Sequence, residues 1–194
     1  KHCPKTRKLR TELNMKKEGK NERTKKVHLN QINHGTKGKN IVQSLKLNRN
    51  DKCINIMTRF HNDGIVGLLI NSLNTGGNNF KSPGFNALKF FSWLKTFSPT
   101  WYSAVPTMHQ VILTRASRNS EIIAETKLRF IRSSSAPLPS TTMKEIENTF
   151  HCPVIESYGM TEAAHQMTSN HLPPGKRKAT KAGFAAGPEI RSEE

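Results

Sequence analysis

Short apolar segments alternate with longer segments of helical period between residues 53 and 155, and this alternation constrains the fold more than any other feature. Asn86 can cap one helical segment, and Pro99 is placed to end it. Strands that alternate with helices form βαβ units, which build parallel sheets. We therefore predict an α/β fold with a parallel sheet and alternating helices. The predicted strands span 53–57, 101–105, 128–132 and 154–155, and the predicted helices span 65–73, 86–97, 106–117 and 140–150.

Polar segments follow three of the predicted strands, at 60–64, 133–137 and 158–162. In open parallel sheets, ligands bind beyond the carboxyl ends of the strands, so we expect these loops to converge on one rim. Each loop alone has an ordinary structural explanation: His61 suits a structural histidine, and serines routinely cap helices and form loops. Their joint appearance in this order favours a binding site.

The segment 156–162, with the sequence ESYGMTE, follows a buried apolar run and carries several groups suited to a nucleotide. We predict that the strand ends in a turn here. The Tyr158 ring can lie against a base, the Thr161 hydroxyl can reach a phosphate oxygen, and the Glu162 carboxylate can hold Mg²⁺. The sequence therefore predicts a nucleotide site at the end of this strand.

The positive charge is concentrated near the start of the chain. Of the net +17, residues 1–26 contribute 11 Lys and Arg against three Glu, a net of +8. Few apolar residues accompany this charge, so we predict that 1–26 is disordered. Such a segment can bind nucleic acid or anionic lipid weakly. The aromatic residues fall in predicted core elements instead of alternating with Lys, which argues against a specific nucleic-acid surface.

The cysteines and the hydropathy indicate an intracellular protein. Cys3, Cys53 and Cys152 form no C-x-x-C pair, and the eight histidines show no spacing typical of metal ligands. We expect buried, reduced thiols. The sequence contains no apolar run long enough to span a membrane and no signal-peptide core. A cytoplasmic or peroxisomal location is the expectation.

The sequence contains the strings FNALKFFSWL, PTWYSAVPTMHQ, LRFIRSSSAPLP and ESYGMTEAAHQMTSN. These four strings resemble the adenylate-forming (AMP-dependent) ligases, the superfamily of acyl-CoA synthetases and luciferases. Within it, the chain looks closest to the oxalate–CoA ligase branch. The resemblance covers 53–190 and implies that 27–194 is part of the large AMP-binding (adenylation) domain, with the family's small C-terminal domain expected to be absent from this chain.

The resemblance also implies roles for individual residues. Thr161 would contact the α-phosphate, and Glu162 would hold Mg²⁺. His61 would lie near the acyl group, with His61, Thr161 and Glu162 forming the catalytic set. His165 is a candidate contact to a short dicarboxylic acid. The implied nucleotide-binding residues are Ser135, Ala136 and Pro137 on one side of the adenine, and Tyr158, Gly159 and Thr161 on the other.

The implied reaction has two steps and uses ATP, Mg²⁺, CoA and a small carboxylic acid. The sequence departs from the family pattern in three places. At 18–26, where a Ser/Thr/Gly-rich phosphate loop is expected, Glu18, Lys20 and Asn21 replace hydroxyl-bearing residues. The loop at 58–64 has drifted, and Thr180 and Lys181 stand where Gly and Ser are expected.

These departures lead to the expectation of an acid–CoA ligase family member that is incomplete or inactive in this chain. Two alternatives remain open. One is a non-catalytic remnant that binds AMP or an acyl-adenylate, and the other is a basic protein that binds nucleic acid or an anionic surface.

Overall fold

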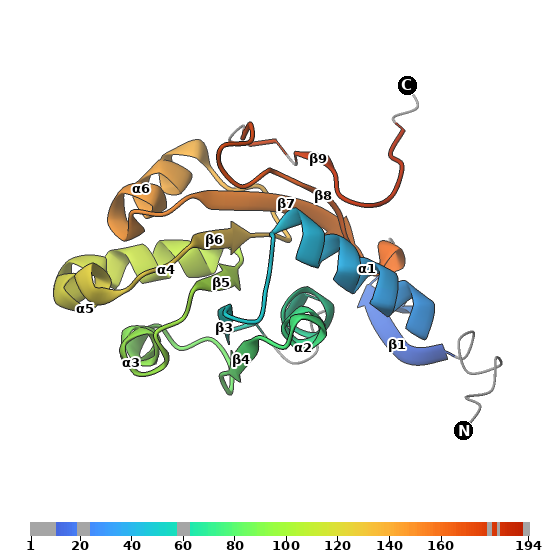
Figure 1. The fold of residues 1–194 in the computed structure, drawn as a ribbon, viewed down its shortest axis with the longest axis horizontal. Coiled ribbons are helices and arrows are strands. Elements are labelled where there is room, and N and C mark those ends of the chain that lie inside the picture. Colours follow the sequence, from blue (N-terminus) through green and yellow to red (C-terminus); the bar gives the residue numbers. More distant parts are fainter. Residues whose placement is uncertain (1–10, 19–23, 58–62, 178–179, 182, 192–194) are drawn as a thin grey trace.

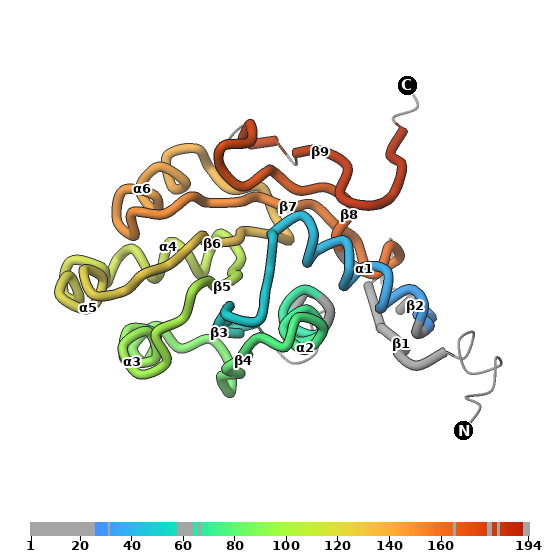
Figure 2. The backbone as a smooth tube through the Cα atoms, viewed as in Figure 1, coloured from blue at the N-terminus to red at the C-terminus, as the bar shows by residue number. Residues whose placement is uncertain are grey.

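The structure is a computed structural model that describes residues 11–18, 24–57, 63–177, 180–181 and 183–191 (Figures 1 and 2). Within these residues the main sheet has seven strands, in the spatial order β4-β3-β5-β6-β7-β8-β9. The first five pair in parallel, and β8 and β9 add to β7 in antiparallel fashion. The strands are β3 (Lys52–Asn55), β4 (Asn78–Lys81), β5 (Trp101–Ala104), β6 (Phe130–Ser133), β7 (Val154–Met160), β8 (His165–Ser169) and β9 (Phe184–Ala185).

Helices cover both faces of this sheet (Figure 1). One face carries α1 (Gln31–Ser44), the π-helix η2 (Asp63–Ile70) and α2 (Asn71–Thr75). The other face carries α3 (Ala87–Phe97), α4 (Pro106–Ala116), the short 3₁₀ turn η3 (Ser117–Asn119), α5 (Ser120–Glu125) and α6 (Ser140–Phe150). The α/β fold with a mostly parallel sheet is therefore confirmed.

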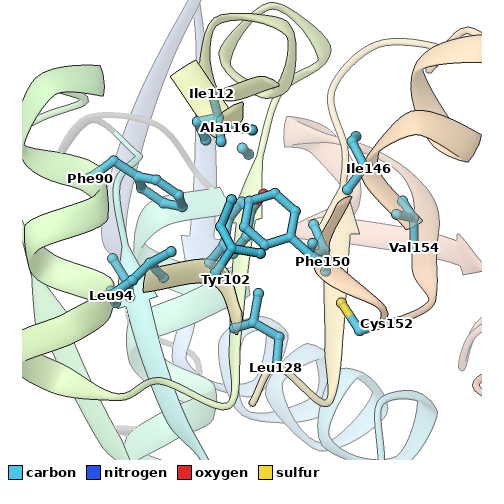
Figure 3. Close-up of a cluster of buried hydrophobic side chains, with 14 of the residues drawn as sticks. Phe90, Leu94, Tyr102, Ile112, Ala116, Leu128, Ile146, Phe150, Cys152 and Val154 are labelled. Carbon is cyan, nitrogen blue, oxygen red and sulfur yellow. The ribbon is translucent and has the colours of Figure 1, made fainter. Parts of the chain in front are cut away.

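The strands are apolar on both sides because helices cover both faces of the sheet, and successive side chains of a strand point to opposite faces. Tyr102 and Ile131 belong to the larger core on the α3–α6 face, whereas their neighbours Trp101 and Phe130 belong to the smaller core on the α1 face. Figure 3 shows the larger core, in which Phe150 lies close to Tyr102. The predicted strands and helices thus bury their side chains on two faces of one sheet.

Local sequence explains where several elements begin. The Asn86 side chain accepts hydrogen bonds from the backbone N–H groups of Leu88 and Lys89, as expected for the cap of α3. Pro106 occupies the first turn of α4. Strand β6 begins at Phe130, two residues later than predicted. The segment predicted as one helix at 65–73 consists of the π-helix η2 followed directly by α2, which extends to Thr75.

The turn predicted within 156–162 is wrong in its position. Strand β7 continues to Met160 because its second half pairs with β8, including Tyr158 with Thr168 and Met160 with His165. The 3₁₀ turn η4 (Thr161–Ala163) follows only then. The antiparallel partner β8 was not predicted, so nothing in the sequence reading extended the strand beyond residue 155.

Disorder predicted for residues 1–26 is not what the structure shows for the described part of that segment. Strand β1 (Thr11–Glu18) pairs in antiparallel register with β2 (Thr24–Asn30), while 1–10 and 19–23 lie outside the described residues. The end of β2 is anchored because Leu29 is buried against Ala164, with Val27 beside it. This anchor lies beyond residue 26, so the composition of the basic segment alone did not reveal it.

Candidate functional site

A cavity of about 230 Å³ lies beyond the carboxyl ends of β6 and β7, where the sequence predicts a ligand site. We call it the rim cavity. One wall follows β6, another is the exposed end of β7, and a third comes from a segment just before β9. The lining residues are Ser135, Ala136, Pro137, Glu156, Ser157, Tyr158, Gly159, Thr180 and Lys181. Five of them, at 135–137 and 158–159, are residues predicted to bind a nucleotide.

Tyr158 presents an aromatic surface at this cavity. The side chain is 49% exposed although it follows four buried positions of β7. An exposed ring held on a paired strand is fixed in position without being used in the core. On the opposite wall, Ser135 has a φ of 74°, a left-handed conformation that is uncommon for a residue with a side chain.

Glu156 is a functional candidate that the sequence reading did not assign. The residue is 7% exposed, and its carboxylate accepts two backbone hydrogen bonds, from Leu138 N–H to Oε1 at 3.2 Å and from Thr180 N–H to Oε2 at 3.0 Å. Burial raises the pKa of Glu156, although the two N–H groups act in the opposite direction. The available signal was a single carboxylate inside the otherwise apolar run PVIE.

Thr161 and Glu162 follow the cavity directly along the chain. They lie in η4, where the backbone N–H of Ala164 donates to the Thr161 carbonyl and Ala164 ends the turn with a φ of 53°. Thr161 is half-buried and Glu162 is exposed. Neither lines the rim cavity, so a ligand would have to extend beyond it to reach both groups.

Of the two predicted histidines, the structure describes only the backbone of His165. His61 lies outside the described residues. His165 begins β8, and its backbone pairs with Met160, which places it beside the end of β7. Its side chain also lies outside the described part. The predicted convergence of the 60–64 loop with the other two loops therefore stays a prediction.

A buried polar network lies on the α1 face of the sheet and was not predicted. Arg132 is fully buried; its Nη1 donates to Ser103 Oγ at 3.2 Å and its Nη2 to Gln166 Oε1 at 3.3 Å. Gln166 Nε2 donates to Ser44 Oγ at 3.0 Å, and Lys37 Nζ donates to the Gln166 carbonyl at 3.3 Å. Burial lowers the pKa of Lys37. These contacts hold α1 against β8.

The cysteine expectation is confirmed for the two cysteines that the structure describes. Cys53 and Cys152 are buried thiols, and burial raises the pKa of Cys152 to about 12. Among the described residues, no three His, Cys, Asp or Glu side chains form a group that could hold a metal ion. In the same part of the chain, no helix is long and apolar enough to cross a membrane.

Larger hollows occur elsewhere on the described surface. They measure about 470 Å³ between α1 and β9, about 440 Å³ beside α5, and about 410 Å³ beside β4. None is lined by a residue that the sequence predicts to bind a ligand. The smaller rim cavity therefore remains the candidate site on chemical grounds.

Comparison with known proteins gives consistent matches. The family described as AMP-binding enzyme matches residues 25–191. The chain is 39% identical over 175 residues to an oxalate–CoA ligase from Arabidopsis thaliana, covering 89% of this chain and 34% of the relative. It is 38% identical over 148 residues to an oxalate–CoA ligase from Saccharomyces cerevisiae, covering 76% and 26%. The chain thus spans about a third or less of these relatives.

Solved structures agree with the fold. ATP-bound MatB from Rhodopseudomonas palustris superimposes with a TM-score of 0.79 at 25% identity, covering 89% of this chain and 33% of that protein. A malonyl-CoA ligase with methylmalonyl-CoA and AMP bound gives a TM-score of 0.80 at 24% identity, covering 89% and 37%. At that identity, the second likeness shows the shared fold alone.

Proposed function

Because the chain belongs to the AMP-binding enzyme family, we propose that its rim cavity holds the adenylate part of ATP in an acid–CoA ligase reaction. The observation that carries the proposal is the meeting of two predicted segments, 135–137 and 158–159, at one cavity beyond the sheet. The chain matches only about a third of the length of the relative from Arabidopsis thaliana, so the whole ligase reaction is part of the proposal.

The cavity has the chemistry that an adenine requires. Ala136 and Pro137 supply an apolar wall, and Tyr158 supplies an aromatic face on the other side. Stacking of a base on an aromatic side chain contributes about 1–3 kcal/mol. The backbone and hydroxyl groups of the same segments supply the few polar contacts that orient a ligand in such a site.

The phosphates would leave the cavity toward η4. Thr161 can donate its hydroxyl to an α-phosphate oxygen, and Glu162 offers one carboxylate at the same place. One carboxylate is enough to fit Mg²⁺, which is commonly bound by one or two carboxylates together with substrate phosphates. When bound, Mg²⁺ would neutralise charge that develops on the phosphates.

The proposed reaction proceeds by two displacements. A carboxylate oxygen of the acid attacks the α-phosphorus, which forms an acyl-adenylate and releases pyrophosphate. The sulfur of CoA then attacks the acyl carbon and releases AMP. We place the acid beside His61 and His165, and the two relatives named oxalate–CoA ligase favour oxalate as the acid. Positioning and charge neutralisation account for most of the catalysis in such steps.

A second candidate is adenylate binding without turnover. The sequence at 18–26 favours it, because Glu18 and Glu22 would stand where a phosphate loop faces the triphosphate. One such carboxylate about 4 Å from a phosphate charge costs on the order of 4 kcal/mol at the effective dielectric of a protein surface. AMP has fewer phosphates and would feel less of this repulsion. The family match favours neither a nucleic-acid binder nor an anionic-surface binder.

The experiment is a thermal melt of the chain with and without Mg²⁺ and a non-hydrolysable acyl-adenylate analogue. A ligand at 100 times its Kd stabilises the native state by about 2.7 kcal/mol, so we expect a clear rise in Tm. The double variant Thr161→Ala, Glu162→Ala should lose most of this rise. The matched control is Glu145→Ala, Thr149→Ala on α6, which removes the same residue types beside a different hollow.

The outcomes separate the two candidates. An equal rise in Tm in both double variants, or no rise in the unmodified chain, would contradict the proposed site. Where the rise occurs, release of AMP on addition of ATP, oxalate and CoA identifies a ligase. A rise in Tm without AMP release identifies the non-catalytic binder.

A further inference from the structure

The two outer walls of the rim cavity are joined through one side chain. Glu156 lies on β7 between them, and each of its carboxylate oxygens accepts a backbone N–H from a different wall. Leu138 belongs to the segment after β6, 18 residues away in sequence, and Thr180 belongs to the segment before β9, 24 residues away. We call this pair of hydrogen bonds the Glu156 bridge.

Both walls contain a residue with strained backbone. Ser135 has a φ of 74° and Thr180 a φ of 64°. A left-handed conformation costs about 1–2 kcal/mol for a residue with a side chain, and a β-branched residue such as Thr is a marked exception there. Strain of this kind persists only where surrounding contacts hold it, and it concentrates at functional sites. Glu156 Oε2 accepts the N–H of the strained Thr180 itself.

The main chain reinforces the connection to the second wall. The Glu156 carbonyl accepts the backbone N–H of Asn170 at 2.9 Å, and Asn170 Nδ2 donates to the Lys181 carbonyl at 3.0 Å. The wall at 180–181 is therefore held to β7 through both the backbone and the side chain of one residue. Both of its described residues, Thr180 and Lys181, line the cavity.

The buried carboxylate is not explained by packing. Glu156 lies two residues after Val154 on β7 and therefore on the same face of the sheet. Val154 and Ile131 are fully buried in the apolar core on that face, so an apolar residue at 156 would extend that core. Burying a carboxylate instead removes it from water at a cost that hydrogen bonds only partly offset. The direction of the pKa change at Glu156 agrees, since burial dominates over the two N–H groups. The carboxylate at position 156 thus lowers the stability of the fold, and what it provides instead is the pair of hydrogen bonds that shape the cavity.

We propose that Glu156 is a positioning residue that fixes the spacing of the cavity walls and so preorganises the cavity for an adenylate. This inference rests on the proposed function for the identity of the ligand. Preorganisation raises affinity because the walls need not be ordered when the ligand binds. The hydrogen bonds that fix the walls require two acceptor oxygens, a requirement that a carboxylate meets and an amide does not.

The test uses Glu156→Gln and Glu156→Asp in the full chain, with Glu147→Gln as the matched control. Glu147 Oε1 also accepts a backbone N–H of β7, from Val154 at 2.8 Å, and pairs with Arg177, but it does not line the cavity. AMP affinity is measured by calorimetry well below each Tm. Exchange of the Leu138 and Thr180 amide hydrogens is measured by NMR.

We expect Glu156→Gln to weaken AMP binding at least tenfold and to speed amide exchange at Leu138 and Thr180. The Gln amide matches the shape of Glu but turns one acceptor into a donor that faces an N–H. Glu156→Asp keeps the charge but lacks one CH₂ of reach, so it should free at least one of the two amides and also weaken binding. Glu147→Gln should lower Tm yet leave AMP affinity within twofold, which separates positioning from general support of β7.

Each result decides the inference. Unchanged amide exchange in Glu156→Gln overturns it, and so does faster exchange with unchanged AMP affinity. Weaker binding with unchanged exchange would assign Glu156 to direct ligand contact and would overturn the bridge. If Glu156→Gln shows no cooperative melt, the same criteria apply to Glu156→Asp. If the unmodified chain binds no AMP, the proposed function fails, and amide exchange alone still tests whether the bridge holds the walls.

Discussion

Arg129 and Asp51 form a bidentate ion pair at the end of the sheet opposite the rim cavity. Arg129 Nε donates to Asp51 Oδ1 at 3.1 Å, and Nη2 donates to Oδ2 at 2.9 Å. The carboxylate also accepts from Thr100 Oγ1 at 2.8 Å and from the backbone N–H of Asn48 at 2.9 Å. These residues precede β6, β3 and β5, so one carboxylate ties together the starts of three adjacent strands.

We predict that Asp51→Ala lowers the free energy of unfolding by about 2–4 kcal/mol, because it removes the carboxylate that accepts from the guanidinium and from two further donors. Arg129 Nη2 keeps only its hydrogen bonds to the Leu45 and Lys46 carbonyls. We expect a loss nearer 2 than 4 kcal/mol, because the Arg129 side chain is 35% exposed and water can solvate its charge. The control is Glu189→Ala, which breaks an ion pair whose side chains are 76% and 80% exposed, and it should cost less than about 1 kcal/mol. Urea denaturation measures the free energy of unfolding of both variants. Equal losses would show that Asp51 stabilises the fold no more than an exposed ion pair does.

The left-handed residue in the cavity wall gives a second prediction. Thr180→Gly keeps the N–H that Glu156 accepts and removes the Cβ that disfavours a φ of 64°. The relief of about 1–2 kcal/mol is partly offset by the greater freedom of Gly in the unfolded chain, so we expect a net gain of about 1 kcal/mol. A rise in Tm of about 2–4 °C should follow. Thr180→Ala keeps the strain, and a similar rise in that control would show that φ is not the cause.

The parts of the fold that could be predicted are those whose signal is local. Strands β5 and β7 and helices α3, α4 and α6 have apolar residues at the spacing of their own element, and Asn86 and Pro106 mark two helix starts. The nucleotide site stays a prediction. It rests on consecutive residues around Tyr158, and that residue lines the rim cavity.

The parts that could not be predicted depend on partners distant in sequence. Strand β4 has the polar sequence NNFK and exists because it pairs with β3 at the edge of the sheet. Helix α1 buries His34 and Gly38 at positions where an apolar residue would have indicated a helix face. The role of Glu156 arises from amides 18 and 24 residues away, so no local pattern could assign it.

The aromatic wall of the cavity gives a third prediction. Tyr158→Ala should weaken AMP binding by roughly 5- to 150-fold, which corresponds to the 1–3 kcal/mol typical of base stacking on an aromatic ring. Tyr158→Phe keeps the ring and should bind AMP within about threefold of the unmodified chain. The side chain is 49% exposed, so neither change should alter Tm by more than about 2 °C. Calorimetric titration with AMP would refute the stacking role if both variants bound alike.

The buried His109 gives a prediction about pH. Its ring is fully buried on α4 with Nδ1 3.5 Å from the Tyr102 hydroxyl, and burial lowers its pKa to about 4. Between pH 4 and the ordinary value near 6.5, the unfolded chain therefore binds more protons at this residue than the native chain does. The contribution to stability is fully present above pH 6.5 and is lost as the pH falls to 4, by up to about 3 kcal/mol.

The measurement is the free energy of unfolding at several pH values for the unmodified chain and for His109→Gln. Carboxylates, including Glu156 with its raised pKa, titrate in both proteins and cancel in the difference. The difference should therefore grow with pH between 4 and 6.5 and become constant above that range. Replacing a packed ring by Gln also adds a pH-independent offset to the difference, so the slope and not the offset is diagnostic. A parallel pair of curves would show that His109 does not titrate on unfolding, and its burial would then have no consequence for the pH dependence of stability.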